Sequence, residues 1–187
     1  MPGALILIDI QTGFDNARWG ARNNPGAERN AGALLAHWRS HRAPVFHILH
    51  VSTAPGSPLS EAARGTGFKP EVQPREGEPV VRKSVNSAFI GTYLEARLRA
   101  AGITRLTVCG LTTPHCVSTT VRMAANLGFG VTLAHDACAA FTANADMGWK
   151  PGARAPGPEA AHDMAVAHLH GEFATARATA EILAEAP

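Results

Sequence analysis

The sequence predicts one α/β domain over residues 1–187, with a parallel sheet covered by helices on both faces. Short apolar runs alternate with segments of helical apolar spacing along the whole chain. The run at 4–8 is continuously apolar, which is typical of a central parallel strand buried on both faces. Neither an internal repeat nor a change in composition marks a domain boundary.

The first half of the chain contains three expected strands. The run at 4–8 ends at Asp9, and the segment after it is expected to be a loop. Apolar residues at helical spacing then predict a helix over about 31–42, followed by a strand at 45–51. Residues 52–79 are rich in Pro, Gly and Ser, as in a functional cover, and a short strand emerges at Val80 and Val81.

The second half continues the alternation of helices and strands. We expect helices at about 93–101, 117–127, 161–169 and 180–186, strands at 106–110 and 129–134, and a short extended piece near Phe173. Residues 146–158 form a second loop rich in Gly and Pro. Since loops at the carboxyl ends of parallel strands bind ligands, the pocket is expected among residues 11–29, 52–79 and 146–158.

Composition excludes several classes of function. The formal net charge is only +2 and no run of Lys and Arg occurs, so neither nucleic acid nor a membrane is an expected partner. Three cysteines without close pairing argue against a disulfide framework and favour the reducing cytoplasm. The first apolar run is too short for a signal peptide or a membrane span.

Cys116 lies where a strand gives way to a helix. The strand ends at Gly110, and helical spacing begins at Val117. Backbone N–H groups and the helix dipole favour a thiolate at such a position, and the same N–H groups could hold an oxyanion. A buried structural cysteine fits the local sequence equally well, and Cys109 and Cys138 are interpreted in that way because both lie in or beside apolar runs.

Three reactive side chains occupy equivalent places along the chain. Asp9, Lys83 and Cys116 each follow a predicted strand, and the carboxyl ends of parallel strands open on one side of a sheet. A carboxylate can take the proton of a thiol, while an ammonium holds that carboxylate and favours the thiolate. Together they predict nucleophilic chemistry.

Three segments resemble the isochorismatase-like cysteine hydrolases. Asp9-Ile10-Gln11-Thr12-Gly13-Phe14 matches the D-x-Q-x-x-F opening of that family, the segment 80–89 is similar to its lysine segment, and 110–117 is similar to its nucleophile motif. The resemblance implies a six-stranded parallel sheet in Rossmann-like order and an Asp9-Lys83-Cys116 triad. It further implies a cis peptide between Leu111 and Thr112, and homodimers or homotetramers.

Differences between this sequence and particular members of that family narrow the expected type of reaction. Isochorismatase proper lacks the cysteine, so Cys116 favours acyl chemistry. Nicotinamidases carry a metal-binding D-x-H motif, but the region around His47 and His50 lacks the Asp, and residues three apart on a strand point to opposite faces. We therefore expect no metal and no cofactor. The stretch after Lys83 looks most like the streptothricin-hydrolase-like branch.

The expected activity is cysteine-dependent hydrolysis of a C–N bond, amide or lactam, in a small-molecule substrate. Backbone N–H groups of Thr112 and Cys116 are expected to hold the oxyanion. The candidates for substrate contact are Phe14, Trp19, His50, Asn86 and His115. Two alternatives stay open: a vinyl-ether hydrolase that does not need Cys116, and a non-enzymatic thiol sensor or partner-binding domain.

Overall fold

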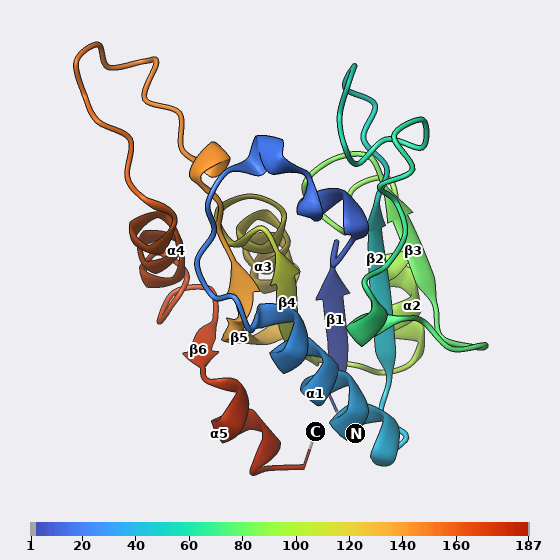
Figure 1. The fold of residues 1–187 in the computed structure, drawn as a ribbon. Coiled ribbons are helices and arrows are strands. Elements are labelled where there is room, and N and C mark those ends of the chain that lie inside the picture. Colours follow the sequence, from blue (N-terminus) through green and yellow to red (C-terminus); the bar gives the residue numbers. More distant parts are fainter. Residues whose placement is uncertain (1–2, 187) are drawn as a thin grey trace.

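A six-stranded parallel sheet forms the centre of the protein (Figure 1). A computed structural model describes residues 3–186. The sheet order is β3-β2-β1-β4-β5-β6, and every neighbouring pair is parallel. The strands are β1 (Ala4–Ile8), β2 (Val45–His50), β3 (Val80–Lys83), β4 (Arg105–Leu111), β5 (Gly130–Ala139) and β6 (Thr175–Arg177). The predicted sheet, its Rossmann-like order and its number of strands are thus confirmed.

Helices cover both faces of this sheet. They are α1 (Ala27–Ser40), α2 (Leu94–Ala100), α3 (Ser118–Asn126), α4 (Pro158–Ala167) and α5 (Thr179–Leu183). Figure 1 shows α1 and α5 in front of the sheet, with α2 and α3 behind it. All five residues of β1 are buried because β1 lies between these layers, which explains why the strand is continuously apolar.

The structure corrects the expected end of one strand. The sequence predicts that the strand after Phe129 ends at Ala134, but β5 continues to Ala139. Pairing with β4 passes from Val108↔Leu133 to Gly110↔Cys138, so extra residues bulge out of β5 between these two pairs. The polar residues His135 and Asp136 lie in this bulge. Because polar residues usually follow the end of a buried strand, their position in the sequence wrongly indicates that the strand ends there.

Gly110 allows β4 to approach β1 closely beside the predicted nucleophile loop. Its φ is +131°, and a Cβ placed on it would lie 2.0 Å from the carbonyl oxygen of Ile8. No other residue fits there without moving the backbone. Because β1 and β4 are also the strands at which the sheet order changes direction, the loops that follow them diverge and leave space between them.

Two of the three segments around the expected pocket, 11–29 and 52–79, are joined above this edge. Gln11 forms an isolated antiparallel bridge with Phe68, and the N–H groups of Thr12 and Gly13 donate to Gly67 and Gly65. The third segment, 146–158, extends away from the sheet beside α4 in Figure 1. Among residues 3–186, no helix is long and apolar enough to cross a membrane.

Candidate active site

Asp9 follows β1 directly and is fully buried. Its φ is +51°, in the left-handed region that Asp tolerates better than most residues. The backbone N–H donates to the carbonyl of Ile48 on β2, which fixes the residue at the edge of the sheet. Strained conformations of this kind persist where the surrounding structure determines them, often at functional sites.

Lys83 is the last residue of β3, and its ammonium reaches Asp9 and Cys116 together. Nζ lies 2.6 Å from Asp9 Oδ2 and 3.2 Å from Cys116 Sγ. It also contacts His50 Nδ1 at 3.0 Å and the carbonyl oxygen of Val85 at 3.2 Å. The side chains of Asp9 and Lys83 are both inaccessible to solvent, so their ion pair is fully buried.

Cys116 lies in a single π-helical turn, Thr113–Val117, between β4 and α3. The N–H groups of His115 and Val117 both donate to the carbonyl of Thr112, which closes the turn. The peptide bond between Leu111 and Thr112 is cis. Single π turns occur often at functional sites.

Burial opposes the thiolate that is expected at Cys116. Burial and the nearby Asp9 carboxylate raise the pKa of the Cys116 thiol to about 12, although Lys83 opposes the shift. Burial also raises the pKa of Asp9, against the effect of Lys83. Desolvation and the Asp9 carboxylate thus outweigh the nearby ammonium and oppose the thiolate that a helix start favours.

A carboxylate oxygen of Asp9, a ring nitrogen of His50 and Cys116 Sγ lie within 4.8 Å of one another, which is the spacing of a metal site. Lys83 Nζ, however, contacts all three groups. The ammonium thus supplies the positive charge that a metal ion would bring to these ligands. The geometry fits a lysine-centred cluster better than a metal centre.

Gln11 anchors the backbone of His50. Its Nε2 donates to the carbonyl of His50 at 3.0 Å, and its Oε1 accepts from the N–H of His50 at 2.8 Å. Burial and Lys83 lower the pKa of His50. His47 points elsewhere, since it is fully buried and its Nε2 contacts Glu78 at 2.9 Å.

The other predicted substrate contacts differ in their surroundings. Phe14 is buried in an aromatic cluster with Trp19 and Phe141, at centroid distances of 5.0 and 5.7 Å. Asn86 and His115 are exposed, and His115 Nδ1 lies 3.4 Å from Asn144 Nδ2. Asn86 and His115 are therefore open to a ligand, while Phe14 serves mainly as packing.

Two buried polar clusters near the site were not predicted. Glu28 accepts from Arg22 at 2.6 Å and from Lys69 at 2.9 Å, and Lys69 also contacts Asp15 at 2.7 Å. His162 contacts Thr113 in the nucleophile turn. Glu28 and His162 lie on helices, where a lone polar residue has no distinctive spacing, so neither cluster has a signal in the sequence.

The fold and this edge of the sheet define a Rossmann-like α/β domain with a carboxylate, an ammonium and a thiol in contact. Comparison with known proteins gives the family. The Isochorismatase domain matches residues 3–181, so the chain belongs to the isochorismatase family.

Relatives cover nearly the whole chain. YrdC, an uncharacterized isochorismatase family protein of Bacillus subtilis, is 42% identical over 180 residues, which span 96% of this chain and 94% of YrdC. A crystal structure of an isochorismatase-family protein from Chromobacterium violaceum is 45% identical and has a TM-score of 0.91, covering 98% of this chain and 92% of that one. A streptothricin hydrolase of Streptomyces noursei is 39% identical over 141 residues, 74% of this chain and 50% of that protein.

Proposed function

We propose that the protein is a cysteine-dependent hydrolase that cleaves a C–N bond, amide or lactam, of a small molecule through a thioester. One observation carries the proposal: the buried ammonium of Lys83 contacts both the carboxylate of Asp9 and the thiol of Cys116. A base and a nucleophile held by a shared cation meet the requirements of covalent catalysis.

In the first step, Asp9 acts as the general base. Its Oδ2 is occupied by Lys83, whereas Oδ1 has no hydrogen-bond partner among residues 3–186. Because the pKa of Cys116 is raised, the thiol rests protonated and gives its proton to Asp9 only as Sγ attacks the carbonyl carbon. The raised pKa of Asp9 makes this carboxylate a better proton acceptor than an exposed one.

In the second step, the negative charge moves to the carbonyl oxygen. The backbone N–H groups of Thr112 and Cys116, beside the cis peptide, are the proposed donors to this oxyanion. When the tetrahedral intermediate collapses, the C–N bond breaks and the leaving nitrogen takes the proton from Asp9. The products at this stage are a free amine and a thioester on Cys116.

Hydrolysis of the thioester repeats these steps with water. Asp9 removes a proton from water, the hydroxide adds to the thioester carbonyl, and the C–S bond breaks. Sγ recovers the proton, so that the carboxylate and the thiol return to their starting states. Trp19, His50, Asn86 and His115 are the proposed contacts for the rest of the substrate.

The comparisons support hydrolysis, and the name of Nicotinamidase 3 of Arabidopsis thaliana, which is 29% identical over 145 residues, supports an amide. The streptothricin hydrolase is 39% identical over the matched residues, and its name describes hydrolysis. That match spans half of the relative.

The test measures ammonia or amine release from a panel of small carboxamides and lactams. Cys116→Ala is expected to lower turnover at least about a thousandfold. Cys109→Ala, which removes a fully buried thiol from β4, is the matched control and is expected to retain activity. Turnover that survives in pure Cys116→Ala protein would contradict the covalent mechanism and favour a vinyl-ether or other non-amide hydrolase.

A further inference from the structure

We propose that His162, on α4, is a positioning residue for the oxyanion site: through Thr113 it holds the turn between the cis peptide and Cys116. The inference rests on the proposed function and extends it to a residue behind the reacting groups. His162 Nδ1 lies 2.8 Å from Thr113 Oγ1, a hydrogen bond between residues 49 apart in the sequence.

Both partners are buried. Thr113 is inaccessible to solvent and His162 is 3% exposed, so water does not compete for their hydrogen bond. A buried polar side chain costs stability unless it is paired, and this pair satisfies both groups. The bond joins α4 to the first residue of the π turn, at the place where α4 packs directly against that turn.

Asn24 fixes the orientation of the imidazole from the other side. Its Nδ2 donates to the carbonyls of Cys138 at 2.8 Å and His135 at 3.4 Å, and it lies 3.5 Å from His162 Nε2. Since an amide nitrogen donates, this contact favours Nε2 as the acceptor and Nδ1 as the ring nitrogen that carries the proton. Nδ1–H then donates to Thr113 Oγ1.

The imidazole is neutral in this arrangement. Burial lowers the pKa of His162, although Asp163, Glu159 and Asp136 oppose the shift, and His135 acts in the same direction as burial. A neutral ring has one donor and one acceptor, which match Thr113 and Asn24. The contact is therefore directional and fixes the position of Thr113 more firmly than apolar packing would.

The position of Thr113 determines where the proposed oxyanion donors point. Thr113 adjoins Thr112, whose N–H belongs to the cis peptide and whose carbonyl closes the π turn. Releasing Oγ1 would let Thr112 turn away from the carbonyl oxygen of the substrate. A displacement of about 1 Å in a catalytic group can cost about a hundredfold in rate.

Two reagents that react with Cys116 separate positioning from general damage. Attack on p-nitrophenyl acetate forms an oxyanion, and p-nitrophenolate leaves as the thioester forms. Attack on iodoacetamide displaces iodide and forms no oxyanion. The ratio of the acylation rate to the alkylation rate therefore reports on the oxyanion site alone, after subtraction of the rates for Cys116→Ala.

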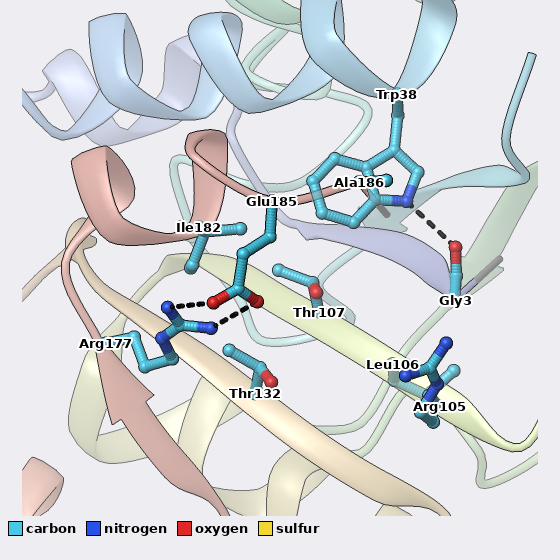
Figure 2. Close-up of a pocket in the computed structure, with 10 residues that line it drawn as sticks. All are labelled: Gly3, Trp38, Arg105, Leu106, Thr107, Thr132, Arg177, Ile182, Glu185 and Ala186. Atoms are coloured by element: carbon cyan, nitrogen blue, oxygen red, sulfur yellow. Dashed lines mark hydrogen bonds and ion pairs between the residues drawn. The ribbon is translucent and has the colours of Figure 1, made fainter. Parts of the chain in front are cut away.

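The variants change one group at a time. Thr113→Val and His162→Leu remove the hydrogen bond, whereas Thr113→Ser and His162→Asn each keep a polar group near the original position. Trp38→Phe is the control for lost stability, because it removes a buried hydrogen bond to the carbonyl of Gly3 at 2.9 Å. Figure 2 shows that bond beside the cavity at the opposite, amino edge of the sheet.

We expect Thr113→Val and His162→Leu to lower the rate of acylation by p-nitrophenyl acetate about tenfold or more. The rate of alkylation by iodoacetamide should change by less than about twofold. The Ser and Asn variants should recover most of the acylation rate, and Trp38→Phe should leave the ratio unchanged. An unchanged ratio in Thr113→Val or, if that variant does not fold, in His162→Leu would overturn the inference. Absence of Cys116-dependent acylation in the wild type would instead overturn the proposed function.

Discussion

Lys83 Nζ lies 2.6 Å from Asp9 Oδ2, and both side chains are shielded from solvent at the carboxyl edge of the sheet. Burying two charges is costly, and their mutual attraction offsets that cost only when the geometry is good. In this protein the same ammonium also contacts Cys116 Sγ and His50 Nδ1. The ammonium of Lys83 is thus the common partner of Asp9, His50 and Cys116, the groups to which the proposed mechanism assigns roles.

Lys83→Met should be strongly destabilising because it leaves the Asp9 carboxylate buried without a counterion. We expect a loss of about 3–5 kcal/mol in the free energy of unfolding at pH 8. Since loss of Lys83 raises the pKa of Asp9 further, acidification should protonate Asp9 and reduce the loss. Urea unfolding of the single variants and of Asp9→Asn/Lys83→Met checks this, and additive effects of the two substitutions would contradict it.

The pKa of Cys116 predicts a characteristic pH dependence of alkylation. With a pKa of about 12, the thiol is protonated at neutral pH, so iodoacetamide should react slowly. The rate should rise about tenfold per pH unit between roughly pH 7 and 10, as the thiolate fraction rises below its pKa. Mass spectrometry of the labelled protein, with Cys116→Ala as background, measures this rate. A plateau already present at pH 7 would show a thiolate at rest.

The sequence was sufficient to place the reactive residues but not their electrostatics. Asp9 and Cys116 follow a strand and Lys83 ends one, and the geometry of a parallel sheet brings those positions together. The raised pKa of Cys116 depends on burial by segments that are distant in the sequence, so local rules about helix starts missed it.

Long-range contacts explain the other differences. The bulge in β5 places Asp136 where it accepts from both Thr179 and Asn30, and these partners are known only once α1 and α5 are placed. His162 likewise acquires its place beside Thr113 from the packing of α4. Hydrophobic periodicity predicts that these helices exist, but it does not predict which polar residues they bring to the site.

His50 should make stability depend on pH in the acidic range. Its pKa is lowered by burial and by Lys83, so the folded protein keeps the ring neutral while the unfolded chain protonates it below about pH 6.5. The resulting stability is present above pH 6.5 and is lost as the pH falls through the lower pKa of the folded state. A single group contributes at most about 1.4 kcal/mol per pH unit.

His50→Gln should remove this contribution. We expect the difference in unfolding free energy between wild type and variant to shrink or reverse between pH 7 and 5, as measured by urea denaturation at each pH. His47, His115 and His162 also have lowered pKa values, but they are present in both proteins and cancel in the comparison. Parallel pH profiles for the two proteins would show that His50 is not protonated on unfolding.

Glu28 should control how firmly the segment 52–79 is held against the rest of the protein. It binds Lys69 from that segment and Arg22 from the preceding loop, and its own pKa is lowered by these two partners against the effect of burial. Glu28→Gln leaves two cations close together without their shared anion. We expect the free energy of unfolding to fall by about 2 kcal/mol and trypsin to cleave within 52–79 about tenfold faster, because local opening becomes easier.

Glu61→Gln is the matched control, since Glu61 pairs with Arg82 on the surface, where ion pairs contribute little. Equal cleavage rates for the two variants would mean that Glu28 does not hold the segment.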